Sequence, residues 1–566
     1  MATAAKQTTG WGVALGVAGV IFLAYLAQTP WTTLWDRDEA WFAEAAVEMV
    51  NSGRYLVPTF NGEIWAAKPV LLYWLMSSSI RAFGATEFAV RVWSPLGVTL
   101  AALFTFAIGR KLFSKWVGHA AMIVLAANLL MMVQGSAATA DAVLLASVTG
   151  SVAIFVTTQL PPTGPPWARV LLLATPLAIG QFAKGPVGLV VPLVAIGSTI
   201  LAGRNAAEAG ARSGDRRRAS LEVGEATVLS IAVLAAWFVL ADVQSGGKFA
   251  REFFGFHVLQ RILTPIEGHG GNFFLTLPFY LPVVLIGFAP WTLYLAGSGS
   301  ALLRAAVGDR MSRALLCGWI GLPVALFTVV MTKLPHYVLP IWPALALLTA
   351  ATLDAHRSGA LPEAATRWLR LGAWFLAPVV ALELAALAAV AVFVGAPGFS
   401  ALAAVLGGLV VALTFVTLRP KWCEQPWRTV TWLGPATLLC QFLAAAWVLP
   451  TVEAVKPVPH LAAIIRVRTE ATTPVATFEF DEPSLVFYVG RTPITRLQSE
   501  KSLAEWARTE APGVLVTPRT SLDRTLRYLG TLPLEEIASA TGINVAKGRW
   551  LELVALRRGA RPRGGA

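Results

Sequence analysis

Long apolar runs fill the first 449 residues of this 566-residue chain and constrain its fold more than any other feature. Hydrophobic residues make up 56% of the sequence and charged residues 14%, which is too apolar for a soluble protein of this length. A transmembrane helix needs about 20 apolar residues. The runs have this length and lack the alternation of polar and apolar residues that is typical of a membrane β-barrel. The sequence therefore predicts an α-helical protein that crosses a membrane many times.

Hydropathy predicts about thirteen spans. They lie near residues 11–28, 91–109, 118–133, 141–158, 169–183, 186–203, 225–243, 273–296, 314–331, 337–353, 371–394, 399–417 and 429–449. We interpret the first run as an uncleaved span rather than a signal peptide, because its positive flank is a single lysine, Lys6.

The basic residues predict which side of the membrane each loop occupies. With the N-terminus inside, the inner loops hold almost twice as many Lys and Arg residues as the outer segments before residue 450. The positive-inside rule therefore places the N-terminus in the cytoplasm, and an odd number of spans places the C-terminal tail outside. Membrane orientation explains the net charge of +13 better than a nucleic-acid partner does. The three scattered cysteines argue against a disulfide framework and against a cysteine metal site.

The chain divides into two predicted domains. Residues 1–449 form a transmembrane domain with a large first outer loop, 29–90, in which two apolar patterns predict helices at 39–50 and 70–83 that lie along the interface. Residues 450–566 form a small outer α/β domain, because strand-like and helix-like stretches alternate there. The strand-like stretches are 475–480, 514–517 and 550–556, and the helix-like stretches are 502–509 and 521–529.

Short polar clusters lie at the outer ends of the predicted spans. Ionisable groups beside hydrocarbon cost roughly 2.5–3.5 kcal/mol each at mid-bilayer by insertion scales, so they usually mark function. Alone, each has a simpler interpretation: Asp38 and Asp141 as helix caps, Lys68 as a snorkelling side chain, and Lys333 with Tyr337 as interface anchors. Their coincidence on one face instead favours an enzyme that acts on a charged, lipid-borne substrate.

These clusters resemble, in the same order along residues 31–345, the polyprenyl-phosphate-sugar-dependent membrane glycosyltransferases. The closer likeness is to the bacterial aminoarabinose-transferase and protein-mannosyltransferase-like group. The motifs are Asp38-Glu39-Ala40-Trp41-Phe42-Ala43-Glu44, Lys68-Pro69, Ala138-Thr139-Ala140-Asp141, Lys184-Gly185-Pro186 and Lys333-Leu334-Pro335-His336-Tyr337. The resemblance implies the C-type membrane glycosyltransferase fold in a bacterial inner membrane, with a periplasmic active site and a periplasmic C-terminal domain.

The resemblance also implies roles for individual residues. An outer-loop aspartate that activates the acceptor matches Asp38, and the candidates for catalysis are Asp38, Glu39 and Asp141. The candidates for holding the donor phosphate are Lys68, Arg261, Tyr337 and Lys333. His257 and Arg261 lie four residues apart, which predicts a shared helical face. One carboxylate base suffices for a single displacement, so the predicted transferase is inverting.

A metal site is the least supported feature of this resemblance. Relatives often carry an acid directly before the motif lysine, where it helps to bind a divalent metal, and this chain has Ala67 there. His257 and His269 are the remaining candidate ligands, and two histidines without the carboxylate make a poor site. The sequence therefore indicates no certain cofactor and leaves a divalent metal in doubt.

The expected partners are a polyprenyl-phosphate sugar donor, a lipid A-like lipid or a glycan acceptor, and membrane lipids. Two alternatives are a protein O-mannosyltransferase-like enzyme and a transporter or flippase of a lipid-linked sugar. A transporter should carry ionisable groups near mid-span, and often internal repeats. Here the candidates lie at span ends and Glu383 is the main exception, so the sequence favours a transferase.

Overall fold

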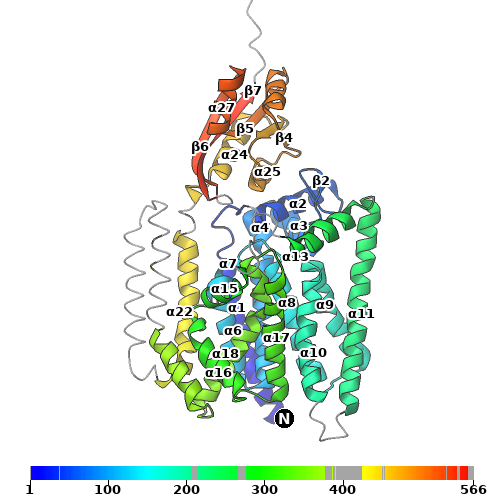
Figure 1. The fold of residues 1–566 in the computed structure, drawn as a ribbon, viewed down its shortest axis with the longest axis vertical. Helices are drawn as coiled ribbons and strands as arrows, with labels where there is room; N and C mark the ends of the chain where they lie inside the picture. Colours follow the sequence, from blue (N-terminus) through cyan, green and yellow to red (C-terminus); the bar gives the residue numbers. More distant parts are fainter. Residues whose placement is uncertain are drawn as a thin grey trace, which may run out of the picture.

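The structure is a computed structural model that describes residues 2–36, 38–204, 213–264, 276–375, 385, 389, 424–448, 450, 453–530, 532–544 and 548–558. A body of long helices forms one end of the molecule, and a unit built on a β-sheet forms the other (Figure 1). The short helices of the first outer loop lie between the two (Figure 1).

Six helical segments of the described residues are long and apolar enough to cross a membrane, and one bent pair would make a seventh. The six are Glu87–Leu112, Asp141–Gln159, Arg217–Gln244, Arg310–Val329, Pro335–Arg357 and Pro426–Trp447. Shorter apolar helices are Gly10–Leu26, Lys115–Ala126 and Val187–Gly203. The predicted multi-span helical fold is therefore confirmed. The count of thirteen stays a prediction, because the spans at 371–394 and 399–417 lie mostly outside the described residues.

Two predicted spans are broken in the structure. The span predicted at 118–133 divides into α6 (Lys115–Ala126) and α7 (Leu129–Gln134), because the Asn128 side chain accepts a hydrogen bond from the Met131 N–H at 3.1 Å and starts a new helix. The span at 273–296 divides at Pro290, where Tyr280–Gly287 and Trp291–Leu303 meet at 109°. Proline cannot continue the helical hydrogen-bond ladder. Hydropathy averages over about 19 residues and does not detect such local breaks.

The first outer loop forms a compact layer over the helical body (Figure 1). Its predicted helices are present as α2 (Asp38–Ser52) and α3 (Leu71–Phe83), joined by the hairpin of β1 (Thr59–Phe60) and β2 (Glu63–Ile64). The two helices pack together through buried apolar side chains such as Phe42 and Tyr73, whose rings form an edge contact.

Glu44 is a buried carboxyl within this layer, and it makes stability depend on pH. Burial, with the nearby charge of Glu48, raises the pKa of Glu44 to about 8. A carboxyl whose folded pKa is raised stabilises the fold at low pH, and that contribution is lost as pH rises through the folded pKa. Glu48 is fixed separately, by hydrogen bonds from Thr59 Oγ1 at 2.5 Å and from the Gly62 N–H.

We therefore expect the wild type to lose stability relative to Glu44→Gln as pH rises from about 5 to 8, with a slope of at most roughly 1.4 kcal/mol per pH unit. Thermal unfolding of the purified protein in micelles, followed by tryptophan fluorescence, measures this difference. The exposed Glu63→Gln serves as the matched control and should show no such slope. Parallel pH curves for wild type and Glu44→Gln would mean that Glu44 is already ionised.

The C-terminal unit is a mixed sheet with the order β4-β3-β5-β7-β6 and helices on both faces. Strands β3 (Val475–Phe478), β4 (Thr495–Leu497) and β5 (Gly513–Pro518) are parallel, and β6 (Leu534–Asn544) and β7 (Arg549–Arg558) add antiparallel pairs. The helices are α24 (Pro457–Arg468), α25 (Pro483–Val489), α26 (Glu500–Arg508) and α27 (Arg519–Leu529). The predicted small α/β fold is confirmed. The domain boundary at residue 450 stays a prediction, since residues 449, 451 and 452 lie outside the described part.

Candidate active site

A largely apolar cavity of about 300 Å³ opens among the ends of several helices and carries three polar side chains from the sequence motifs. Lys68, Lys184 and Tyr337 line it together with His257. The other lining residues are apolar: Ala67, Pro69, Leu144, Pro186, Val187, Val190, Phe253, Val258, Ile262, Leu326, Phe327 and Val330. Cations in the wall of a largely apolar cavity fit a ligand with a hydrocarbon chain and an anionic head.

The turn around Gly185 places Lys184 at this cavity. Lys184 is the last residue of α9 (Pro166–Lys184), and Gly185 has a φ of +67°, a conformation that side chains other than glycine's rarely adopt. The next helix, α10 (Val187–Arg204), packs against α9 so closely that a Cβ on Gly188 would lie 2.0 Å from the carbonyl carbon of Gly180. The small residues therefore fix the hairpin that carries Lys184.

Asp141 forms an ion pair with this lysine. It is the first residue of α8 (Asp141–Gln159), where no side chain caps the helix, and its Oδ1 accepts a hydrogen bond from Lys184 Nζ at 2.5 Å. Both side chains are at most 10% exposed. The interpretation of Asp141 as a helix cap is therefore wrong, because the nearby ammonium is the stronger partner for a buried carboxylate.

His336 joins the cluster, although the sequence gave it no role. It lies next to Tyr337 in η4 (Pro335–Ile341), and the charges of Asp38, Lys68, Asp141 and Lys184 all act on its imidazole. The Lys184 ammonium lies 5.3 Å from the centroid of the Tyr337 ring. Motif residues from the first outer loop, α8, α9 and η4 therefore converge at one place. The sequence did contain a signal that Lys184 and His336 belong to the site, because they lie in the motifs Lys184-Gly185-Pro186 and Lys333-Leu334-Pro335-His336-Tyr337.

A second cavity, of about 330 Å³, has Asp38 in its wall. Polar residues from three parts of the chain line it: Gln28, Thr32, Asp36, Asp38, Glu39, Arg91, Ser136 and Thr139. Asp38 is the exposed first residue of α2, and no hydrogen bond or ion pair joins its carboxylate to another described residue. Burial raises the pKa of Asp36 to about 6, against the effect of its hydrogen bonds from Ser484. Asp38 is thus the accessible carboxylate at this cavity.

Glu39, the third catalytic candidate, is occupied by structural contacts. Its carboxylate accepts hydrogen bonds from Arg91 Nε at 2.9 Å and Nη2 at 2.6 Å, and from the N–H groups of Trp35 at 2.8 Å and Ala138 at 2.6 Å. Burial acts to raise the pKa of Glu39, but the Arg91 guanidinium and the backbone hydrogen bonds overcome it and hold this pKa below its usual value. The structure therefore favours a positioning role for Glu39 over a catalytic one.

Lys333 is absent from the lining of the apolar cavity and also has structural partners. Its ammonium donates to the carbonyls of Phe327, at 3.0 Å, and Thr328, at 2.5 Å, at the end of α17 (Arg310–Val329). It is 3% exposed, and burial lowers the pKa of Lys333. Capping this helix is thus the role that the structure favours.

Arg261 and the two histidines are placed only in part. Residues 251–260 form a π-helix, η2 (Arg251–Gln260), so the α-helical spacing that predicted a shared face for His257 and Arg261 does not apply. The side chain of Arg261 and all of His269 lie outside the described part of the chain.

The residues around the motif lysine do not fit a divalent metal. The side chain at position 67 is a methyl group, and His257 supplies one imidazole beside the Trp65 ring. Across the described ranges, no group of three or more His, Cys, Asp or Glu residues is placed to hold a metal ion.

Comparison with known sequences supports the resemblance noted from the motifs. Residues 67–208 match a family model described as dolichyl-phosphate-mannose-protein mannosyltransferase. The chain is 30% identical over 350 residues to the undecaprenyl phosphate-alpha-4-amino-4-deoxy-L-arabinose arabinosyl transferase of Edwardsiella ictaluri, and 32% identical over 352 residues to enzyme 1 of this name from Sodalis glossinidius. These alignments include 61% and 60% of this chain, and they span 59% of the length of each relative.

Comparison with solved structures confirms the predicted fold. The structure of ArnT from Cupriavidus metallidurans bound to undecaprenyl phosphate superposes with a TM-score of 0.77 at 20% identity, over 99% of this chain and 100% of that one. An archaeal oligosaccharyltransferase, AglB from Archaeoglobus fulgidus, gives a TM-score of 0.51 at 12% identity, over 91% and 70%. The chain therefore has the C-type membrane glycosyltransferase fold.

Proposed function

We propose that this protein is an inverting glycosyltransferase that moves a sugar from a polyprenyl-phosphate donor to a lipid acceptor, of the lipid A kind, outside the cytoplasm. The observation that carries the proposal is that Asp38, from one cavity, and Lys68 and Lys184, from the other, all lie close enough for their charges to act on the His336 imidazole. The apolar cavity presents Lys68 and Lys184, and the second cavity presents the accessible carboxylate of Asp38. The relatives named as undecaprenyl-phosphate aminoarabinose transferases support the same donor class.

In this proposal the apolar cavity holds the donor. The first isoprene units lie against its apolar lining, and the phosphate lies beside Lys68, Lys184 and the Tyr337 hydroxyl. The bond from the anomeric carbon to the phosphate oxygen breaks during transfer, so negative charge grows on the phosphate. Two ammonium groups in a largely apolar cavity stabilise that charge more than they would in bulk water. Asp141 orients Lys184 through their ion pair.

Asp38 acts on the acceptor, which enters through the second cavity. Its carboxylate accepts the proton of the acceptor group as that oxygen bonds to the anomeric carbon, on the face opposite the departing phosphate. One displacement inverts the configuration at this carbon, and no second carboxylate nucleophile is needed. Asp38 is free of structural partners among the described residues, whereas Glu39 is not.

The side of the membrane on which this reaction takes place follows from the distribution of basic residues among the loops and from the position of the cluster around His336. The positive-inside rule puts the first outer loop and the C-terminal unit on the periplasmic side of a bacterial inner membrane. The cluster lies under that loop, where a lipid-linked donor and a membrane-embedded acceptor can both reach it. The relatives named as arabinosyl transferases align over more of the chain than the protein-mannosyltransferase model, which matches residues 67–208, so a lipid acceptor is favoured over a protein.

Lys68→Ala is expected to weaken donor binding about 10- to 100-fold, because a charge-assisted hydrogen bond contributes roughly 1.5–3 kcal/mol. Turnover should fall as well, since the same ammonium faces the leaving phosphate. Titration of the purified protein with polyprenyl phosphate, followed by tryptophan fluorescence, measures the Kd. Lys248→Ala removes an exposed lysine outside the cavity and should leave the Kd unchanged. Equal Kd values for the two variants would remove Lys68 from the donor site.

Label transfer tests the function itself and identifies the sugar. Membranes that contain the protein are incubated with a panel of labelled polyprenyl-phosphate sugars, and the labelled products are separated and analysed by mass spectrometry. The proposal expects one sugar to move to a membrane lipid, with none transferred by membranes that lack the protein. Label found only in a protein would support the mannosyltransferase-like alternative instead.

A further inference from the structure

The segment of residues 33–36, just before Asp38, is bound by the C-terminal unit. The Asp36 carboxylate accepts hydrogen bonds from the Ser484 N–H at 2.8 Å and from Ser484 Oγ at 2.6 Å. The Leu34 N–H donates to the Tyr488 hydroxyl at 2.6 Å. Both partners belong to α25, so one helix of the C-terminal unit fixes a side chain and a backbone group of this segment.

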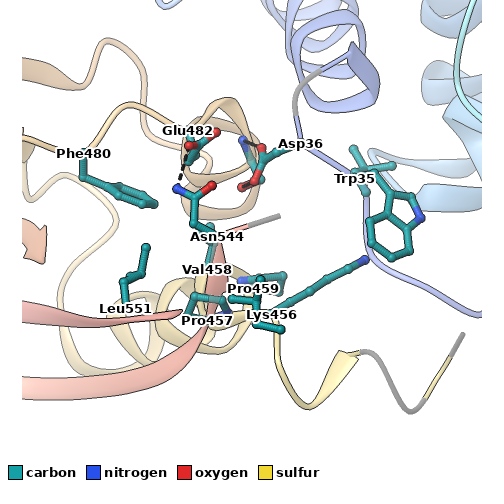
Figure 2. A pocket seen from close by; sticks show the side chains of 13 residues that line it. Trp35, Asp36, Lys456, Pro457, Val458, Pro459, Phe480, Glu482, Asn544 and Leu551 are labelled. Atoms are coloured by element: carbon teal, nitrogen blue, oxygen red, sulfur yellow. Dashed lines mark hydrogen bonds between the residues drawn. The ribbon is translucent and has the colours of Figure 1, made fainter. Parts of the chain in front are cut away.

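Lys456, directly before α24, adds a third contact. Its ammonium donates to the Thr33 carbonyl at 3.0 Å and lies 3.8 Å from the centroid of the Trp35 ring. Figure 2 shows the Lys456 side chain extending toward Trp35. Lys456, Trp35 and Asp36 all line one small space under the C-terminal unit. Thr33 Oγ1 in turn donates to Glu453 at 2.6 Å. Every residue of the 33–36 segment thus contacts the C-terminal unit.

The same segment also forms part of the second cavity, through which the proposed acceptor enters and which is here called the acceptor-side cavity. Trp35 and Asp36 line both the small space under the C-terminal unit and the cavity of about 330 Å³ that Asp38 lines. From the membrane side, Arg91 donates to the Thr33 carbonyl at 3.0 Å. The segment is therefore held between Arg91 below and the C-terminal unit above, and a shift of it would move the cavity wall and the start of α2.

We propose that the C-terminal unit is a positioning part of the transfer site, which holds the acceptor cavity and Asp38 in place through Ser484, Tyr488 and Lys456. The inference rests on the proposed function, because it takes Asp38 as the group that acts on the acceptor. The three residues are positioning residues: they touch residues 33–36, and none of them lines the cavity that holds Asp38. Among the described residues, none from the C-terminal unit lines the donor cavity.

This arrangement predicts that variants of the positioning residues impair the reaction with the acceptor but leave donor binding unchanged. In the full-length protein, Ser484→Ala should lower kcat/KM for the acceptor about 10- to 100-fold, since small displacements of reacting groups have effects of this size. The Kd for polyprenyl phosphate should stay unchanged. Tyr488→Phe, which removes only the hydroxyl that binds Leu34, should show the same split. Ser484→Thr keeps a hydroxyl and should restore most of the activity.

Ser499→Ala is the matched control. Ser499 Oγ caps α26 by accepting from the Ser502 N–H at 3.1 Å, so this variant loses a serine hydrogen bond in the same unit without touching residues 33–36. Its kinetic constants should equal those of the wild type. Equal constants for Ser484→Ala and Ser499→Ala would overturn the inference, as would a parallel loss of donor binding in Ser484→Ala.

The outcome separates this inference from the proposed function. If the wild type transfers sugar and Asp38→Asn does not, while Ser484→Ala and Tyr488→Phe behave as wild type, the positioning role is wrong and the transferase stands. If the folded wild type transfers no sugar, the proposed function itself is wrong, and the inference fails with it.

Discussion

Replacing Asp38 by asparagine should lower the turnover number about 10²- to 10⁴-fold while leaving donor binding nearly intact. The substitution keeps the size of the side chain and its ability to form hydrogen bonds, but it removes the ability to accept a proton. Asp38 lines the acceptor-side cavity and is absent from the lining of the donor cavity, so the Kd for polyprenyl phosphate should not change. Steady-state kinetics with saturating donor, together with the fluorescence titration, measure the two quantities separately.

Asp523→Asn is a suitable control for this variant, because it changes an exposed aspartate on α27, far along the chain from the site. Its turnover should match that of the wild type. Near-normal turnover of a folded Asp38→Asn protein would show that another carboxylate is the base. Asp36 and Asp141 would then be the next candidates, and each would have to release the partner that it holds in this structure.

Glu39→Gln should reduce the free energy of unfolding by about 3–5 kcal/mol, because it leaves Arg91 as a buried charge without its counter-ion. The pair is joined at 2.6 Å, and the two side chains are 3% and 4% exposed. The low pKa of Glu39 means that the carboxylate is ionised in the folded protein, and its stabilising effect is lost only as pH falls through that pKa. Denaturant titration in micelles measures the loss.

The exposed pair of Glu535 and Arg557 provides the control, with side chains 64% and 44% exposed. Glu535→Gln should cost at most about 1 kcal/mol, as exposed pairs generally do. A double variant, Glu39→Leu with Arg91→Met, should be more stable than Glu39→Gln, because it buries no unpaired charge. If Glu39→Gln is as stable as Glu535→Gln but inactive, Glu39 has a catalytic role after all.

The sequence predicted the helical membrane fold well, because the signal for a span lies within the span. It also placed α2, α3 and several elements of the C-terminal sheet, whose amphipathic patterns are equally local. Strand β6 was missed, since Glu535 and Glu536 interrupt its apolar pattern at the exposed edge of the sheet. The breaks at Asn128 and Pro290 depend on single residues, which a hydropathy average does not resolve.

The candidate site could be predicted only in part, because its residues meet through long-range contacts. Asp38 and Lys68 stand out in motifs, but Arg91 reaches Glu39 from 52 residues away, and nothing in the sequence pairs them. Lys184 reaches Asp141 across 43 residues. An acid at a span end therefore suggested a helix cap or catalysis for Asp141 and catalysis for Glu39, whereas tertiary contacts give both a cationic partner.

The chemical fate of the donor in detergent micelles tests the central claim most directly. Micelles have no two sides, so a transporter or flippase leaves the donor unchanged there, whereas a transferase still breaks the bond between sugar and phosphate. The purified protein is mixed with labelled polyprenyl-phosphate sugar and a lipid extract that contains the acceptor, and both lipids are analysed by mass spectrometry. We expect free polyprenyl phosphate and a glycosylated lipid in equal amounts, with the rate of product formation lowered about 10²- to 10⁴-fold by Asp38→Asn. Donor that stays intact with folded wild-type protein, in the presence of the acceptor extract, would contradict the transferase assignment.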